Sequence, residues 1–549
     1  MTQHPAGTGS TTGVGRTAAE DAILGRLMLA FEGFGVPPWM SERLASAPAA
    51  GVTLFRHVNV ENASQVRTLT DALQAARQPG PPLLVAADQE GGQLMALGEG
   101  TPFAGNMALG ATGDPELAER VGQAIGRELR AVGVNVNYAP DCDVASNPDS
   151  PGLGIRSFGD DPAAVSRLAA ATVRGLQAAG MAATAKHFPG KGDVGVDTHY
   201  QLGAIGHDRA RLDAVELAPF RAAIEAGVRV VMSGHFAIPA LTHNPTLPAT
   251  VSRAVMHDLL RDELGFDGLV ISDALDMRAL AQGATQIVDL IAALRAGVDL
   301  LLCAPDRSSL EQTEEALRLA ARRELFDADV LAASTNRILA LRHWLRSAAQ
   351  PDLEVVGSAE HVALSREVAE RSVTLVRNDA GLLPLRLPAD GRVLAVMPQP
   401  ANMTPADTSA SVAPGLAAAI RSRHPHVDEV VTGLPPTPPE IAALRQRAAE
   451  YELVVVGTIN AWFDSGQVDL VNEFLTSGVP VVTVALRVPW DLARYPAAAT
   501  HVCTYSILPP SLDALVGAMW GDLPFRGRLP AAIPGLHPTG HGLAAWAAG

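Results

Sequence analysis

Lysine is nearly absent from this chain. Only two of the 42 basic residues are lysine, and the others are arginine. Both lysines, Lys186 and Lys191, fall in the run KHFPGKGDVGVDTH, which ends at His199 and also contains a second histidine and two aspartates. An ammonium is a compact point charge with three rotatable donors, so a guanidinium cannot replace it in a tight site. We interpret this run as part of an active site rather than as a chance cluster in a glycine-rich loop.

Cysteine, aromatic residues and excess positive charge are also scarce. The three cysteines (Cys142, Cys303 and Cys503) are scattered and form no metal-ligand pair, which predicts buried free thiols in a reducing compartment. Aromatic residues make up 4% of the chain, which argues against long stacking platforms for polymers. The formal net charge of −16 argues against a nucleic-acid partner or an anionic membrane surface.

The chain has no apolar run long enough to cross a bilayer. The stretch at residues 24–34 carries Arg26 and Glu32 and is too short to span. The first residues lack the basic start and apolar core of a secretory signal, and the Gly/Ser/Thr-rich segment 1–17 is expected to be disordered. We therefore expect a cytoplasmic protein without a membrane partner.

Short β-rich runs alternate with long Ala/Leu/Arg helical patterns over residues 18–345. Repeated β-then-α units, several with strands apolar on both faces, predict a (β/α)₈ TIM-like barrel. Seven strands are clear: 52–55, 83–87, 134–138, 182–185, 228–232, 269–272 and 298–302. The predicted helices include 114–132, 162–179, 208–226 and 252–264. Polar residues follow the strands, where barrel enzymes place their sites, namely Asp88, Asp143, Lys186, His187, His235 and Asp273.

A second α/β pattern follows a linker at residues 346–357. Strand patterns at 393–397, 453–457, 481–485 and 501–505 alternate with helices. Residues 358–549 are therefore expected to form a C-terminal α/β sandwich domain.

Two groups of residues have the chemistry of nucleophilic and acid–base catalysis. Asp273 stands at the end of a predicted strand, where a carboxylate can be a nucleophile or simply the N-cap of a helix. Asp197 and His199, two apart in an extended loop, share a face, so the carboxylate can fix the tautomer of the imidazole and tune its basicity. Without its flanking motif, such a pair would be an ordinary loop feature.

Several ordered motifs give the chain a resemblance to glycoside hydrolase family 3, in particular to its β-N-acetylglucosaminidase branch, over roughly residues 20 to 540. These motifs are residues 51–55, DQEGG from Asp88, NVNYAP at 135–140 followed by Asp143, RSFG from Arg156, the run at 186–199, and Ser272-Asp273 with Met277.

The resemblance implies a retaining mechanism in which Asp273 forms a covalent glycosyl-enzyme and His199, held by Asp197, is the acid and base. Since this pair lies in the barrel, the second domain is expected to be structural or to shape the cleft, and not to be catalytic. It also implies that the sugar hydroxyls are held by Asp88, Arg156, Lys186 and His187. Glu90 is a candidate to support these residues, and His235 is either a support or part of the core. Neither a metal nor a cofactor is implied, because Asp and His suffice.

The expected reaction is hydrolysis of terminal β-linked N-acetylglucosamine (GlcNAc) from small glycans or muropeptides, as in cell-wall recycling, by a monomer or homodimer. Two alternatives stay open. A neutral imidazole does not repel an anion, so inorganic phosphate could replace water and make the protein a phosphorylase of β-N-acetylglucosaminides or β-glucosides. The chain could also be a catalytically degenerate sugar-binding protein, although the retained Asp273, Asp197 and His199 argue against this.

Two positions depart from the family pattern. Ala96 stands where an arginine that helps to hold the sugar is expected, so a hydroxyl contact is lost or comes from elsewhere. Lys191 stands where the family often has histidine or another residue, and it is either a solvated loop charge, which we favour, or a group for an anionic aglycone or phosphate.

Overall fold

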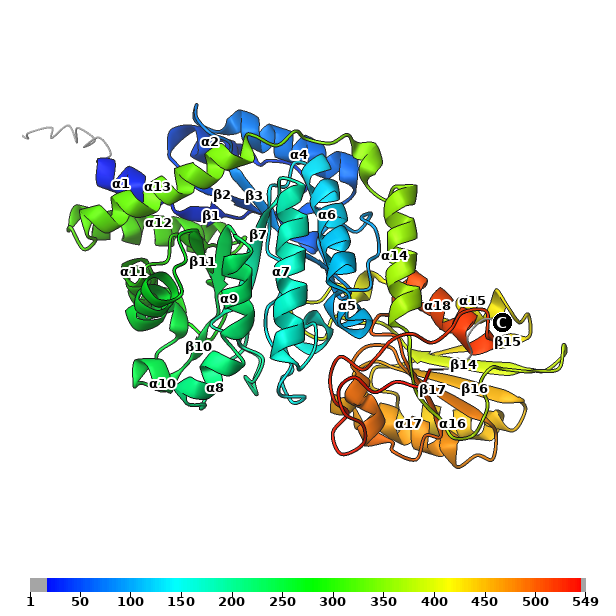
Figure 1. Ribbon diagram of the computed structural model, residues 1–549. Coiled ribbons are helices and arrows are strands. Elements are labelled where there is room, and N and C mark those ends of the chain that lie inside the picture. The colour runs from blue at the N-terminus through cyan, green and yellow to red at the C-terminus, as the bar shows by residue number, and fades with distance from the viewer. Residues whose placement is uncertain (1–16, 545–549) are drawn as a thin grey trace, which may run out of the picture.

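The computed structural model describes residues 17–544, which form a barrel followed by a second, smaller α/β unit (Figure 1). Residues 1–16 of the segment expected to be disordered lie outside the described range. Thr17 is described, and it caps α1 (Ala18–Leu24) by accepting a hydrogen bond from the Glu20 backbone.

Eight parallel strands close into a barrel, which confirms the predicted (β/α)₈ fold. Neighbours around the barrel follow the chain order, with the first and last strands paired. The strand that the sequence pattern missed is β1, a run of only three residues. The barrel strands are β1 (Leu27–Leu29), β2 (Gly51–Thr53), β3 (Leu84–Ala87), β6 (Val136–Asn137), β7 (Ala182–Phe188), β9 (Val230–Ser233), β11 (Leu269–Ala274) and β12 (Leu300–Leu302).

Helices cover the outside of the barrel and form part of the connections between its strands. Two predicted helices are confirmed, each with an aspartate N-cap followed by proline: α6 (Pro115–Ala131) and α7 (Pro162–Ala178). The helix predicted at 252–264 is present as the π-helical segment η3 (Ala254–Glu263). Further helices, which the sequence analysis did not name, are α2 (Pro38–Ser46), α3 (Arg56–Asn59), α4 (Ala63–Ala76), α5 (Asn106–Thr112), α10 (Pro239–Thr242), α11 (Gln286–Ala296) and α12 (Arg307–Arg322). Two short pairs, β4 (Gln89–Gly91) with β5 (Leu94–Met95) and β8 (Gly203–Ala204) with β10 (Phe236–Ala237), lie in loops.

The prediction of a single helix at 208–226 is wrong. The chain forms α8 (Arg209–Ala214) and α9 (Ala218–Glu225), separated by a break at Val215. Pro219 explains the restart, since proline fits only the first turn of a helix and disrupts its interior.

The amino-terminal end of the barrel is closed by α13 (Ala328–Leu345). Ile338, Leu341 and Leu345 of this helix join the apolar side chains inside the barrel in one buried cluster. Arg337 pairs with Asp299, one residue before β12, at 2.8 Å. This end is therefore packed and apolar, which leaves the carboxyl ends of the strands for polar side chains.

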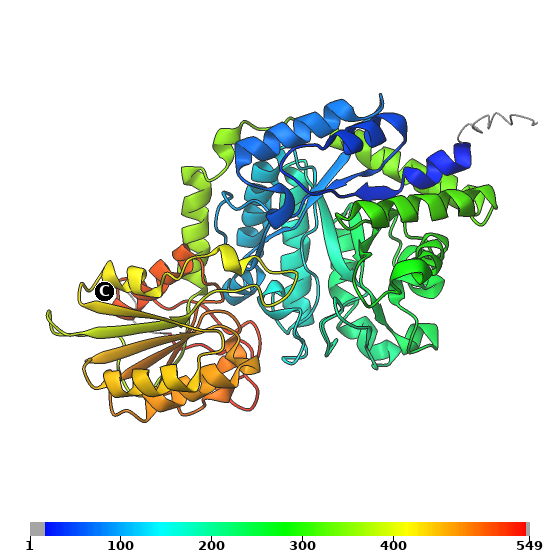
Figure 2. The same cartoon turned by 180° about the vertical axis from the view of Figure 1, so that it is seen from behind.

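The second unit is a six-stranded sheet in the order β13-β18-β17-β16-β14-β15, with helices on both faces (Figures 1 and 2). All neighbours are parallel except β13 and β18. The strands are β13 (Thr374–Asn378), β14 (Val393–Pro398), β15 (Val427–Thr432), β16 (Leu453–Thr458), β17 (Val481–Ala485) and β18 (Thr500–Cys503). The helices are α14 (Ala359–Ser372), α15 (Leu416–Arg421), α16 (Pro438–Ala448), α17 (Ser465–Leu475) and α18 (Pro509–Trp520).

The predicted linker lies against the barrel. Its Gly357 backbone donates a hydrogen bond to Glu128 of α6, and Leu353 packs on the core. Figure 1 shows α14 running from the barrel toward the sheet. None of the helices in residues 17–544 has the length and apolarity that a membrane span requires.

Candidate active site

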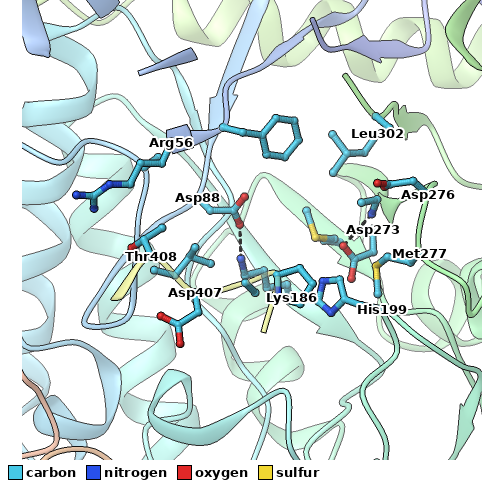
Figure 3. Close-up of a pocket in the computed structure, with 18 of the residues that line it drawn as sticks. Arg56, Asp88, Lys186, His199, Asp273, Asp276, Met277, Leu302, Asp407 and Thr408 are labelled. Carbon is cyan, nitrogen blue, oxygen red and sulfur yellow. Dashed lines mark hydrogen bonds and ion pairs between the residues drawn. The ribbon is translucent and has the colours of Figure 1, made fainter. Parts of the chain in front are cut away.

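A cavity of about 500 Å³ opens at the carboxyl ends of the barrel strands. Figure 3 shows His199 and Asp273 on one side, Arg56 and Asp407 on the other, and Lys186 between them with Asp88. Side chains from well-separated parts of the sequence thus meet in one pocket. The predicted residues among its lining are Asp88, Arg156, Lys186, His187, His199 and Asp273, and Ala96 and Lys191 line it as well.

Asp273 is the fifth residue of β11, and its carboxylate faces the cavity. Its Oδ1 accepts a hydrogen bond from the Ala274 backbone at 2.8 Å. Burial would raise the pKa of Asp273, but the positive charges of Lys191 and neighbouring histidines hold it below the ordinary value. The side chain is therefore an anion at neutral pH. It does not cap a helix, so the alternative N-cap role is wrong.

His199 and Asp197 form the predicted pair. Asp197 Oδ1 lies 2.7 Å from His199 Nδ1 and also accepts the His199 backbone N–H at 2.9 Å. Burial opposes ionisation of Asp197, but the hydrogen bonds from His199 and its charge lower the pKa of Asp197 below normal. With Nδ1 directed at the carboxylate, Nε2 is free to exchange a proton. The Arg278 backbone, in the loop after Asp273, donates to the His199 carbonyl at 3.0 Å, so the two loops are joined.

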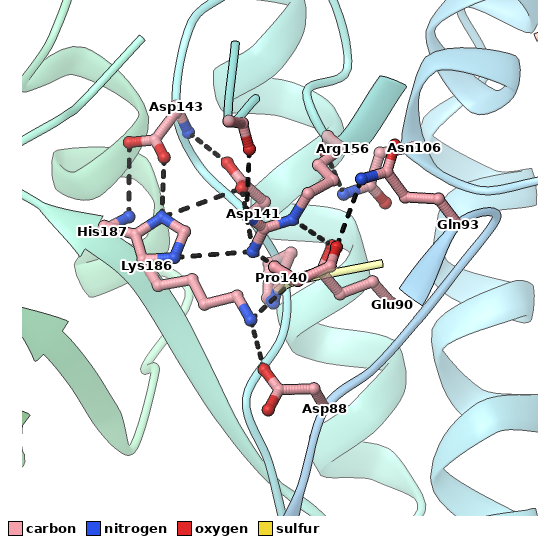
Figure 4. Close-up of polar contacts among 12 residues, drawn as sticks. Asp88, Glu90, Gln93, Asn106, Pro140, Asp141, Asp143, Arg156, Lys186 and His187 are labelled. Carbon is pink, nitrogen blue, oxygen red and sulfur yellow. Dashed lines mark hydrogen bonds and ion pairs between the residues drawn. The ribbon is translucent and has the colours of Figure 1, made fainter. Parts of the chain in front are cut away.

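Three buried charged side chains (Glu90, Arg156 and Lys186) and the half-buried Asp88 form the floor of the cavity (Figure 4). Lys186 Nζ lies 2.6 Å from both Asp88 Oδ1 and Glu90 Oε1. Arg156 binds Glu90 with two nitrogens, at 2.9 and 2.7 Å. Burial would raise the pKa of Glu90, but the charges of Arg156 and Lys186 lower it. Glu90 therefore supports both cations, as the sequence suggested.

His187 is held from behind by Asp143. Its Nδ1 lies 2.8 Å from Asp143 Oδ2, and Arg156 approaches the other ring nitrogen at 3.5 Å. Burial and then the charge of Lys191 lower the pKa of His187 well below normal, so the ring is neutral. The sequence analysis did not identify Asp141 as a site residue. Its Oδ2 lies 3.7 Å from a guanidinium nitrogen of Arg156. Burial raises the pKa of Asp141 well above its ordinary value, with repulsion from Asp143 adding to the effect.

The ligand atoms of Asp141, Asp143 and His187 lie within 4.8 Å of one another, a spacing that could hold a metal ion. The Lys191 backbone donates to Asp143 at 2.7 Å, whereas Asp141 Oδ2 accepts no hydrogen bond from the described residues and lies 3.7 Å from Arg156. In this arrangement Asp143 contacts His187 directly, at Nδ1, and so orients the ring.

His235 contacts the end of the strand that carries Asp273. It is fully buried, its Nδ1 is 2.7 Å from Thr250 Oγ1, and its Nε2 is 3.2 Å from the Ala274 carbonyl. Of the two roles considered, these contacts favour support of the strand end that carries Asp273.

Lys191 is not a solvated loop charge, and that expectation is wrong. Its residue is 5% exposed, and its side chain lines the cavity. The loop folds inward because the Lys191 backbone is bound to buried Asp143. Arg56 is a second cation that the sequence analysis did not identify. Its guanidinium donates to the carbonyl of Met95, the residue before Ala96, at 3.0 Å, and it lines the same cavity.

The second unit supplies one wall of the cavity through residues 405–408. Thr408 donates to the Gln93 carbonyl at 2.7 Å, and Asp407 pairs with Arg487 at 2.9 Å. Arg487 also binds the Gln93 side chain. Figure 2 shows the segment after β14, in yellow, reaching from the sheet to the barrel. No local pattern marks this loop, so only the fold could reveal it.

A (β/α)₈ barrel whose carboxyl-end cavity is lined by an ionised carboxylate, Asp273, and a carboxylate-bound imidazole, His199, has the architecture and the reacting groups of a glycoside hydrolase. Residues 39–341 match the family model described as the glycosyl hydrolase family 3 N terminal domain. The chain belongs to glycoside hydrolase family 3.

Three similar proteins illustrate the membership. Beta-hexosaminidase A of Pseudoalteromonas piscicida is 36% identical over 378 residues, which are 64% of this chain and 63% of that protein. Beta-N-acetylglucosaminidase/beta-glucosidase of Cellulomonas fimi is 31% identical over 540 residues, 93% of each chain. The structure of a family 3 beta-N-acetylglucosaminidase from Paenibacillus sp. str. FPU-7 aligns with a TM-score of 0.89 at 33% identity, covering 94% of this chain and 99% of that one.

Proposed function

We propose that this enzyme is a retaining β-N-acetylhexosaminidase that removes terminal β-linked GlcNAc from small glycans or muropeptides. The observation that carries the proposal is that Asp273, an anion, and His199, oriented by Asp197, line one cavity. The names of the similar proteins, which are hexosaminidases and acetylglucosaminidases, support the same substrate class.

In the proposed first step, a carboxylate oxygen of Asp273 bonds to the anomeric carbon as the glycosidic C–O bond breaks. Protonated His199 gives its Nε2 proton to the leaving oxygen, while Asp197 stabilises the imidazolium. In the second step, neutral His199 takes a proton from water, whose oxygen attacks the anomeric carbon and releases Asp273. Two inversions at one carbon give net retention.

The buried charges on the cavity floor fit the recognition of sugar hydroxyls. Asp88 can accept from a hydroxyl, and Lys186 and Arg156 can donate to one, with charge-assisted hydrogen bonds. Their mutual pairing fixes their positions before the sugar arrives, which reduces the ordering cost of binding. These assignments follow the chemistry of each side chain and its place on the cavity wall.

The test is release of nitrophenol from 4-nitrophenyl N-acetyl-β-glucosaminide by the wild type and by Asp273→Ala. We expect turnover by the wild type, a loss of at least about 10⁴-fold in the variant, and partial rescue by azide, a small nucleophile that gives the glycosyl azide. No turnover by the wild type on any aryl β-glycoside would contradict the proposal and favour a degenerate binding protein.

The same assay with and without inorganic phosphate tests whether water or phosphate accepts the sugar. Water is the acceptor in the proposed reaction, so the product is free GlcNAc at every phosphate concentration. Accumulation of a sugar 1-phosphate would show instead that the neutral imidazole admits an anionic acceptor and that the enzyme is a phosphorylase.

We further propose a cytoplasmic setting in cell-wall recycling. The three cysteines are free and buried, in agreement with a reducing compartment. Cell fractionation tests the location, and an enzyme found wholly outside the cytoplasm would contradict it.

A further inference from the structure

The pair Asp197 and His199 lies on a long connection without regular secondary structure. Between β7 and β8, the described residues 189–202 form no helix or strand. The backbone of such a connection is positioned by its contacts with the rest of the protein. The Arg278 backbone holds it at the His199 carbonyl, at 3.0 Å. A second support comes from the segment after β6, residues 147–156, which we call the bridging segment.

The bridging segment contacts the connection at two points. The Asn147 side chain donates through Nδ2 to the backbone carbonyl of Asp193 at 3.4 Å. Gly152 lies beside Asp197, since a Cβ added at Gly152 would be 3.8 Å from Asp197 Oδ1. The second of these points is the carboxylate that orients the proposed acid and base.

The second unit holds the bridging segment through one indole. Trp462 Nε1 donates a hydrogen bond to Asp149 Oδ1 at 2.7 Å. The backbone of Asp149 in turn donates to Asn147 Oδ1 at 3.0 Å. The two ends of the Asn147 amide therefore join the contact from Trp462 to the loop of the acid/base pair. A hydrogen bond to an ionised acceptor is stronger than one between neutral groups.

Trp462 is itself held by its own unit. It lies in the short 3-10 helix η7 (Ala461–Phe463), which follows Asn460 in a left-handed conformation with a φ of 51°. A residue other than glycine is uncommon in this conformation. The backbone N–H of Trp462 donates to buried Asp491 at 2.9 Å, and Arg494 lies over the indole at 5.9 Å. These contacts fix the direction in which the indole N–H points.

We propose that Trp462 is a positioning residue for proton transfer in the barrel. Through Asp149 and Asn147 it holds the loop that carries Asp197 and His199. This role rests on the function proposed above. Neither Trp462 nor Asp149 lines the cavity, so the effect on the reaction is indirect. The second unit thus acts on the acid and base as well as on the cavity wall.

The first part of the same run is held independently of Trp462. Lys186 and His187 belong to β7, and the Lys191 backbone is bound to buried Asp143. Loss of the indole donor should therefore displace the acid/base pair more than the cavity floor. A misplacement of about 1 Å, even one caused far from the reacting atoms, can cost up to about 100-fold in rate.

The test compares kcat/KM of the wild type and Trp462→Phe on phenyl and 2,4-dinitrophenyl N-acetyl-β-glucosaminide. Phenylalanine keeps an aromatic ring and removes the N–H donor. The phenyl leaving group needs a proton in the transition state, and the dinitrophenyl group needs hardly any. We expect a loss of about 5- to 50-fold on the phenyl substrate and of at most about threefold on the dinitrophenyl substrate.

Asp149→Ala removes the acceptor from the barrel side and should give the same dependence on the leaving group. It also keeps the test available if Trp462→Phe does not fold. Because both changes break one hydrogen bond, the double variant should be no slower than the slower single variant. The matched control is Trp520→Phe, at the end of α18, which packs on the core of the second unit. It should change neither kcat/KM by more than about twofold.

An equal loss on the two substrates would overturn the proposal, because it would show a general disturbance of the cavity. An unchanged kcat/KM on the phenyl substrate would overturn it as well, and so would losses that add in the double variant. Failure of the proposed function is distinguishable, because the wild type itself would then turn over neither substrate.

Discussion

At the scale of single residues, carboxylates orient the other groups of the site. Glu90 holds Lys186 and Arg156. In the same way, Asp143 holds His187 and Asp197 holds His199. Removing one partner of such a buried pair leaves an uncompensated charge or a misoriented ring, which costs more than the pair itself contributes. These contacts therefore position the charged and aromatic groups of the site in the absence of a sugar.

The Asp197–His199 pair gives the first residue-scale prediction. Asp197→Asn removes the charge that stabilises the imidazolium, so kcat/KM on 4-methylumbelliferyl N-acetyl-β-glucosaminide is expected to fall about 10²- to 10⁴-fold. The leaving group of the 2,4-dinitrophenyl glycoside needs little proton donation. For that substrate, the rate of the pre-steady-state burst should therefore fall much less.

The chain offers a matched control for this variant. Asp193, in the same run, pairs with His207 at 2.7 Å and is not part of the cavity lining. Asp193→Asn should keep most of the activity. If both variants lose activity equally and irrespective of leaving group, Asp197 has only a structural role.

At the scale of elements, the sequence pattern predicted the buried strands best. Parallel strands such as β9 and β16 are apolar on both faces and read as continuous runs. The edge strand β15 was missed because Asp428 and Glu429 interrupt its alternating pattern. The strand β1 was missed because a three-residue run carries too little signal.

The pairing of β17 with β18 buries a histidine and gives an element-scale prediction. His501 Nδ1 lies 2.8 Å from Thr483 Oγ1, and burial lowers the pKa of His501 to about 3. An unfolded histidine has a pKa of about 6.5, so the unfolded chain binds more protons between these values. The stability contributed by neutral His501 is complete above about pH 6.5 and is lost as the pH falls toward 3.

The free energy of unfolding of wild type and His501→Gln, measured with urea at several pH values, tests this account. The stability advantage of the wild type should shrink by about 1.4 kcal/mol for each pH unit below 6.5. Between pH 7.5 and 8.5 the difference should be constant. A difference that stays constant down to pH 4.5 would contradict the low pKa.

At the scale of the whole molecule, the second unit completes the cavity. Gln93 of the barrel joins Thr408 and Arg487 of the second unit, and Arg487 in turn holds Asp407. A buried ion pair of this kind contributes little net stability, but breaking it is strongly destabilising. The sequence analysis expected this unit to be either structural or cleft-shaping. The structure shows that it shapes the cleft.

Arg487→Met leaves Asp407 buried without its cation, and we expect a loss of about 3–5 kcal/mol of stability. Because residues 405–408 line the cavity, KM for the aryl glycoside should rise as well. The control is Arg445→Met, which removes an exposed pair with Glu473 and should change stability by less than about 1 kcal/mol. Thermal unfolding and steady-state kinetics measure both effects. Equal behaviour of the two variants would show that the contact between the units is dispensable.

The sequence by itself determined the barrel, the second α/β unit and the residues with catalytic chemistry, because apolar periodicity and ordered motifs are local properties of the chain. The predicted boundaries of these units and the roles of Asp273, His199 and Asp197 stay predictions. Only the tertiary structure decided which groups meet. It showed that Lys191, expected at the surface, is buried beside the cavity. It also showed that Arg56, Asp141 and Asp407 lie at the site. Such contacts join residues far apart in the chain, and their energies depend on burial and on partners that no local pattern records.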